Sequence, residues 1–127
     1  MNVERLLMVK EAILKHPDET NMMLLHDRRQ HCHCIFGWAQ VLFSPRFLDR
    51  FWRGRYVKRP DSEAEIFSFL GMTYAEGRRL YYADRWPGDL FVRYIQSQTK
   101  AEEAQVMAEA IDRFIADPGF MSETKIA

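Results

Sequence analysis

The sequence predicts an all-α fold in which five to seven short helices pack around a buried central helix at about residues 34–43. Residues 35–43 include only one strongly polar side chain, Gln40, and a helix that is apolar all round is buried. At three later places Ser or Thr is followed by Glu three residues on, a capping-box pattern that begins helices. Residues 90–95 are β-prone, but no partner strand is evident, so we expect a helix there too.

The composition is typical of a soluble globular protein. The chain has 127 residues, 47% hydrophobic and 28% charged, and this length supports one hydrophobic core. No apolar run approaches the roughly 20 residues of a membrane span, and the amino-terminal segment has charges where a signal peptide would be apolar. Two cysteines in a Cys-x-Cys spacing indicate a reducing compartment. We therefore expect a single cytoplasmic domain, residues 1–127, without membrane attachment or a cofactor.

Helix signals follow one another along the first part of the chain. Asn2 can cap a first helix that runs to about Lys15, and Pro17 ends it because proline disfavours helical geometry in the residue before it. We place five apolar residues of this helix on one face: Val3, Leu6, Leu7, Ile13 and Leu14. Residues 18–25 are ambiguous between a helical turn and an extended piece, and residues 26–33 form a polar stretch before the central helix.

Further helices are predicted by their caps. Ser44 and Pro45 begin a short helix that ends near Arg53, and a basic linker follows at residues 55–60. The three capping boxes are Ser62-x-x-Glu65, Thr73-x-x-Glu76 and Thr99-x-x-Glu102. Their helices end near Gly71, Ala83 and Asp117, in that order. From the central and last helices we expect four core residues: Ile35, Trp38, Leu42 and Phe114.

Two stretches of the sequence resemble a known group of proteins. The run Cys34-Ile35-Phe36-Gly37-Trp38-Ala39 is similar to the Cys-Ile-Ala-Gly-Trp-Ala core of a group of small uncharacterised bacterial and phage proteins. The later run Leu70-Gly71-Met72-x-x-x-x-Gly77-x-x-Leu80-Tyr81, followed by Trp86-Pro87, is similar to that group's spacing. The match covers roughly residues 10–115 and departs from the group at Phe36, where a small residue is expected. The resemblance implies a compact helical domain and brings no established activity with it.

Histidine and cysteine cluster at residues 31–34, with His26 upstream, where a metal or a reactive thiol would be expected first. Imidazole and thiolate are zinc ligands, but adjacent residues cannot complete a tetrahedron and no distant second pair is visible. We therefore expect no bound metal, with His31, Cys34 and His26 as the candidates should one bind. Cys34 could alternatively be a nucleophile with His31 as its base, although no third group is evident. Otherwise Cys34 is a small buried residue, and His31 and His33 are partly exposed.

Charge is unevenly distributed along the chain. Residues 28–59 carry eight Arg or Lys side chains against one acid, Asp49, whereas residues 60–127 carry seven basic and twelve acidic side chains. Six basic residues are interleaved with aromatic ones and form a candidate partner-binding surface, the arginine-rich segment: Arg46, Arg50, Arg53, Arg55, Lys58 and Arg59. A solvated helix face would have the same composition.

Residues 62–80 give the order helix, glycine-containing turn, helix that is typical of a DNA-binding helix-turn-helix. Two residues depart from that motif. Phe67 stands where a small residue normally lets the helices approach, and Gly77 stands where the second helix should present an apolar side chain. The face that would contact DNA carries both signs of charge: Arg78, Arg79 and Glu76.

These features predict a small intracellular interaction protein, for which a phage or mobile-element association is a further expectation. It would bind a macromolecular partner through the arginine-rich segment. We expect that partner to be a protein, because the acidic half of a chain with zero net charge repels a polyanion. Nucleic-acid binding by the same segment or by residues 62–80 is the alternative. A metal- or thiol-dependent enzyme at the His/Cys cluster is the third interpretation.

Overall fold

The computed structural model describes residues 1–23, 25–27, 32–44 and 62–120. Six α-helices lie within them: α1 (Val3–Lys15), α2 (Ile35–Phe43), α4 (Glu63–Phe69), α5 (Tyr74–Tyr81), α6 (Gly88–Gln96) and α7 (Lys100–Ala116). The same residues include two 3-10 helices, η1 (Pro17–Glu19) and η2 (Ala83–Arg85), and two short strands, β1 (His26–Asp27) and β2 (Cys32–His33). The predicted all-α fold is confirmed.

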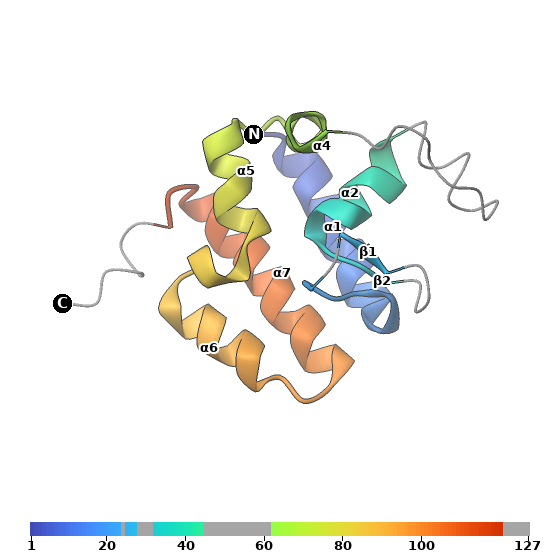
Figure 1. The fold of residues 1–127 in the computed structure, drawn as a ribbon, viewed down its shortest axis with the longest axis vertical. Helices are drawn as coiled ribbons and strands as arrows, with labels where there is room; N and C mark the ends of the chain where they lie inside the picture. Colours follow the sequence, from blue (N-terminus) through green and yellow to red (C-terminus); the bar gives the residue numbers. More distant parts are fainter. Residues whose placement is uncertain (24, 28–31, 45–61, 121–127) are drawn as a thin grey trace.

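The helices share one hydrophobic core. α7 runs through the middle of the molecule, with α1 and α2 on one side and α5 and α6 on the other (Figure 1). α1 packs against α7 and α2, α6 packs against α7, and α2 packs against α4. No helix in the described part of the chain is long and apolar enough to cross a membrane.

α2 is the buried helix that the sequence predicts. Each of its residues from Ile35 to Val41 is buried, including the polar Gln40. Of the four expected core residues, three are buried: Ile35, Trp38 and Phe114. Leu42 is half-buried, because the last turn of α2 lies at the edge of the core.

α1 has the predicted ends but a different buried face. The Asn2 side chain accepts a hydrogen bond from the Arg5 backbone N–H (3.0 Å), and the helix ends at Lys15, before Pro17. Its buried residues are Leu6, Val9 and Ile13. The expectation of a single apolar face is wrong for three residues, which are exposed: Val3, Leu7 and Leu14. α1 has apolar side chains on two sides, and the sequence does not show which side meets α7.

α4 has only seven residues, and both of its ends are capped. Ser62 and Glu65 form the predicted reciprocal capping box. At the other end, Gly71 has a φ of 64°, in the left-handed region that favours glycine. The last four carbonyls each accept a hydrogen bond: Phe67 from Met72 N (3.1 Å), Ser68 from Gly71 N (3.0 Å), Phe69 from the Arg5 guanidinium (3.0 Å) and Leu70 from Asn2 N (2.7 Å). The start of α1 therefore holds the end of α4.

α4 and α5 cross steeply, since Figure 1 views α4 along its axis while α5 lies in the plane of the picture. A Cβ atom placed on Gly77 would lie 2.3 Å from Cγ of Phe67, so the phenyl ring fills the space that a side chain would need. The two departures from the helix-turn-helix pattern are thus one compensating pair. The large residue lies on the first helix and the small one on the second, and close packing is preserved.

The later helices follow the predicted order with small differences. α5 begins with its reciprocal capping box and ends at Tyr81, slightly earlier than expected. α6 begins at Gly88, so the β-prone run is helical as predicted. α7 has half of the expected box. Thr99 Oγ1 accepts from the Glu102 N–H, but the Glu102 carboxylate accepts from the backbone N–H of Gln98 instead of Thr99 (both 3.1 Å).

The polar stretch before α2 contains a short antiparallel hairpin that the sequence does not predict. Its backbone pairs are His26 with His33 and Asp27 with Cys32. Strands of two residues are too short to show the alternation by which a strand is recognised. His33 is 1% exposed, so the expected partial exposure is wrong. In β2 its ring packs against Trp38, with 4.9 Å between the ring centroids.

Trp38 connects α2 to the segment that follows α1. Its indole N–H donates to Thr20 Oγ1 (3.0 Å), and the Thr20 hydroxyl donates to the His16 carbonyl (2.9 Å). The rings of His16 and His33 lie against the indole, at centroid distances of 5.7 and 4.9 Å. The indole thus packs and bonds at once, which a smaller side chain could not do.

Gly77→Ala should destabilise the protein, although alanine is the better helix former. In an open helical position this change stabilises by up to about 1 kcal/mol, whereas here the methyl group meets the Phe67 ring, and overpacking costs roughly 1–3 kcal/mol. Urea unfolding measures the effect. In a Phe67→Ala background, which leaves a cavity, Gly77→Ala should cost nothing or stabilise. A stabilised single variant would contradict the packing.

Trp38→Ala should cost roughly 3–5 kcal/mol of unfolding free energy, as truncation of a buried aromatic side chain does. Thr20→Val removes the acceptor of the indole N–H and should cost about 1–3 kcal/mol, because the buried donor is left unsatisfied. Both values come from denaturant unfolding monitored by circular dichroism. A Trp38→Ala variant that unfolds at the parent's midpoint would show that α2 is not central to the fold.

Candidate interaction surface

The arginine-rich segment predicted to bind a partner lies at residues 46–59, outside the described residues. The helix expected between Ser44 and Arg53 lies there as well, apart from Ser44 itself, which ends α2. The partner-binding role of the segment therefore stays a prediction from the sequence.

The His/Cys cluster is divided by the structure. His31 lies outside the described residues, and for His26 the backbone alone is described. Cys34 is buried and caps α2, where its Sγ accepts a hydrogen bond from the Gly37 N–H (3.4 Å). Burial raises the pKa of the Cys34 thiol to about 11, so it stays protonated near neutral pH. This disfavours Cys34 as a nucleophile, because the thiolate is the reactive form.

Metal ligands do not converge in the described part of the chain. No three His, Cys, Asp or Glu side chains gather there closely enough to hold a metal ion. Cys32 is buried, and its Sγ contacts the Asp18 carbonyl (3.4 Å). His33 packs on Trp38. The described members of the cluster thus contribute to packing around α2.

The exposed side of α5 carries a row of aromatic and basic side chains. Tyr74, Arg78 and Tyr82 follow at intervals of four residues, so they lie above one another on the helix. The Arg78 guanidinium carbon is 5.5 Å from the Tyr74 ring centroid and 5.3 Å from that of Tyr82. Arg85 extends the row, 5.7 Å from the Tyr82 ring. We call these four residues the tyrosine–arginine ladder.

The ladder is exposed on one side and supported on the other. Tyr74 is 51% exposed and Tyr82 is 36% exposed. The Phe67 ring packs against Tyr74 (5.8 Å between centroids), and Tyr81, which also contacts Phe67, packs against Tyr82 (4.9 Å). The side chains are thus held in place before any partner binds. The signal was present in the sequence as Tyr and Arg at helical spacing, but a search for arginine runs did not find it.

Both signs of charge lie around the ladder. Residues 62–85 contain three arginines and four acids: Glu63, Glu65, Glu76 and Asp84. The Thr73 backbone N–H donates to the Glu76 carboxylate and lowers its pKa, so Glu76 is charged at neutral pH. Arg79 donates to the Pro118 carbonyl (3.2 Å). The local charge is therefore close to neutral.

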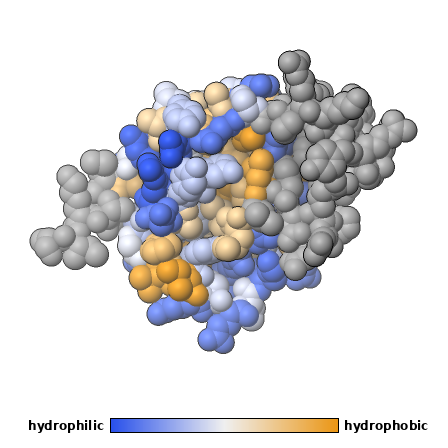
Figure 2. Space-filling model, in the orientation of Figure 1, coloured by the Kyte–Doolittle hydropathy of each residue, from blue (hydrophilic) through white to orange (hydrophobic). Residues whose placement is uncertain are grey.

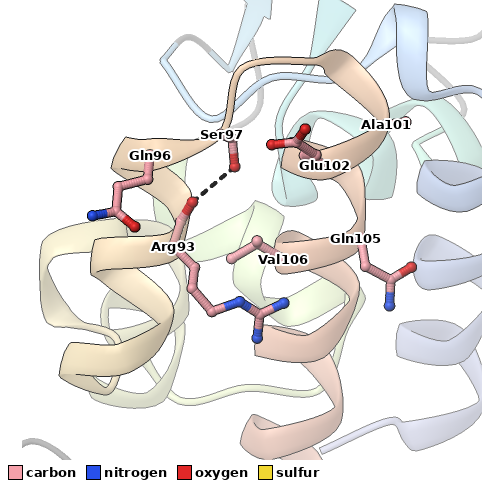
Figure 3. Close-up of a pocket in the computed structure, with 7 residues that line it drawn as sticks. All are labelled: Arg93, Gln96, Ser97, Ala101, Glu102, Gln105 and Val106. Atoms are coloured by element: carbon pink, nitrogen blue, oxygen red, sulfur yellow. Dashed lines mark hydrogen bonds between the residues drawn. The ribbon is translucent and has the colours of Figure 1, made fainter.

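A shallow groove of about 490 Å³ lies between α6 and α7 (Figure 3). Its lining residues are Arg93, Gln96, Ser97, Ala101, Glu102, Gln105 and Val106. The charged groups are already engaged, because Arg93 pairs with Glu109 and the Glu102 carboxylate accepts from Gln98. Ser97 Oγ donates to the Arg93 carbonyl (2.8 Å). This groove presents no convergent set of polar groups of the kind that fixes a small ligand.

An apolar patch lies over α6 on the face seen in Figure 2. Val92 is 49% exposed and Ile95 is 62% exposed. Two ion pairs, Asp89 with Arg113 and Arg93 with Glu109, connect the same helix to α7. The patch is small, and single exposed apolar residues are common on monomeric proteins.

Neither cysteine thiol should react in the folded protein. Cys32 and Cys34 are 1% and 3% exposed, and the Cys34 thiol is protonated at about pH 8, where an unfolded cysteine is partly thiolate. A chromogenic disulfide reagent should detect no thiol in buffer and both thiols in guanidinium chloride. Rapid reaction of one thiol in buffer would reinstate the nucleophile hypothesis.

No protein-family model matches the chain, and neither curated proteins nor solved structures gave a significant match. The resemblance to small bacterial and phage proteins therefore stays a prediction from two motifs. Any function has to be argued from the surface geometry of the described residues.

Proposed function

We propose that the protein is an interaction module that binds another protein, with the tyrosine–arginine ladder as a main contact surface. The observation that carries this proposal is the position of Arg78, whose guanidinium lies between the exposed rings of Tyr74 and Tyr82. Its buried Nε has no hydrogen-bond partner, so the rings hold the guanidinium on that side. Nothing among the described residues resembles a catalytic arrangement of comparable order.

Tyrosine and arginine are the residue types that protein interfaces favour. They are enriched at interfaces and dominate the residues whose truncation costs most binding energy. Ordering a long arginine side chain on binding costs up to about 2 kcal/mol of conformational entropy. In the ladder much of that cost is met in the free protein, because the two tyrosines already restrict Arg78.

The charges around the ladder support a protein partner over a nucleic acid. Binding to a phosphate backbone requires a surplus of Lys and Arg. Residues 62–85 have three basic and four acidic side chains, and α4 has Glu63 and Glu65 in its first turn. A mixed surface of this kind suits a partner that carries both signs of charge.

The arginine-rich segment belongs to the same proposal as a second contact. Its six basic residues and interleaved aromatic residues have the composition of an interface, and residues 28–59 have one acid. This part of the proposal rests on the sequence. The ladder and the segment can be tested separately, because they share no residue.

Nucleic-acid binding is the second candidate function. The interlock of Phe67 with Gly77 removes the main objection to a helix-turn-helix at α4 and α5, since the two helices pack closely in spite of the exchanged sizes. α5 would then be the helix that enters a groove, and Arg78 would be on its exposed side.

Capture from a lysate of the cells that encode the chain, with nuclease treatment, tests the first proposal. Arg78→Lys keeps the charge but loses the planar guanidinium, so partner capture should fall at least about tenfold, or ~1.4 kcal/mol. Tyr74→Ala with Tyr82→Ala should have the same effect. Met23→Ala, at an 80% exposed side chain outside the ladder, is the matched control and should capture as the parent does.

The same variants decide between the two candidate partners. If Arg78→Lys captures as much protein as the parent while the melting temperature is unchanged, the ladder is not a protein-binding surface. Titration with a labelled random duplex gives the other outcome. Binding that weakens steeply with salt, by about 0.9 log units per log unit of salt for each phosphate contact, would favour the helix-turn-helix function.

A further inference from the structure

α1 is apolar on two opposite sides, and the core covers one of them. The inner side, with Leu6, Val9 and Ile13, packs against α7 and α2. The outer side has three exposed apolar residues: Val3 (39%), Leu7 (45%) and Leu14 (43%). A surface helix of a monomeric protein normally has polar residues on its outer side.

The outer residues follow the spacing of a coiled-coil seam. With Lys10 included, the intervals along α1 are four, three and four residues: Val3, Leu7, Lys10 and Leu14. Two helices that carry this spacing pack along the seam, and a single lysine within it is a known means of selecting one arrangement. A shallow groove of about 450 Å³ lies on the same face, between Leu7 and Leu14.

The lysine of this seam is already neutralised. Lys10 Nζ lies 2.8 and 2.9 Å from the two carboxylate oxygens of Asp112 in α7. Packing a second helix over Lys10 therefore does not leave its charge without a counterion. The seam is compatible with burial along its whole length.

We propose that this face binds a second copy of the chain, with the two α1 helices parallel about a two-fold axis. Lys10 and Glu11 are about 100° apart on the helix, so they lie on opposite sides of the line through Leu7 and Leu14. A parallel two-fold pair brings the Lys10 side of one helix against the Glu11 side of the other. Each lysine then meets a glutamate of the second copy, twice in the dimer.

Charge also selects the parallel arrangement. An antiparallel two-fold pair would bring Lys10 against its own copy and Glu11 against its own copy, which is repulsive. The parallel pair stacks like residues in the seam: Val3, Leu7 and Leu14 each on its own copy. A face that complements itself in this way fits a second copy better than an unrelated apolar partner.

The length of the seam sets the strength of the association. α1 has 13 residues and is about 20 Å long, so one helix pair buries less surface than a permanent dimer interface. The dimer should therefore form and dissociate with concentration. This inference does not depend on the proposed function, since the ladder lies on α5.

Sedimentation equilibrium tests the association. Between about 10 µM and 1 mM the average mass of the parent should rise from 15.1 kDa toward twice that value. Leu7→Glu should stay at the monomer mass with an unchanged melting temperature, because Leu7 is outside the core. Val92→Glu, at a similarly exposed apolar residue of α6, should dimerise like the parent. A parent that remains monomeric over this range, or equal effects of both variants, would overturn the proposal.

Disulfide cross-linking tests the direction of the helices. Leu7→Cys and Leu14→Cys should each form a covalent dimer on mild oxidation, since each residue lies against its own copy. Cys32 and Cys34 are buried and should not contribute. Val92→Cys reports random collisions. Cross-linking only in an equal mixture of Leu7→Cys and Leu14→Cys would show an antiparallel pair and overturn the arrangement.

Discussion

The Phe67 ring is the contact on which the arrangement of the other helices depends. It fills the space beside Gly77 and so fixes how α4 crosses α5. On its other sides it meets Phe36 of α2 (4.9 Å between centroids) and Tyr81 of α5 (6.0 Å). One fully buried side chain thus positions three helices, and the exposed tyrosines of α5 are oriented by what lies beneath them. Dense packing transmits position in this way because a core has few alternative arrangements.

The local features of this fold could be predicted, because they depend on residues close together in the sequence. Asn2 caps α1, Ser62 with Glu65 begins α4, and Gly71 ends it, each by hydrogen bonds within one turn. The buried α2 was also predictable, since an almost uninterrupted apolar run has no solvent-facing side. These signals require no knowledge of which helices touch.

Features that depend on pairing between distant segments were not predictable. Phe67 and Gly77 were each interpreted as a defect, and only their contact shows that one compensates the other. His33 was expected at the surface because its burial requires a hairpin and Trp38. The ladder was missed because its four residues are spread over twelve positions of α5 and η2, where no charge run or motif marks them. The arginine-rich segment was the stronger signal by composition, yet it lies outside the described residues.

The contact between α1 and α7 has a consequence for synthesis on the ribosome. α7 ends at residue 116 and covers the inner face of a helix that begins at residue 3, so the core cannot close until most of the chain has been made. Until then Leu6, Val9 and Ile13 stay uncovered by their final partner. Local elements such as the capped α4 can form early, whereas the first helix emerges first and is completed last. The nascent chain therefore presents an amphipathic amino-terminal helix to chaperones throughout elongation.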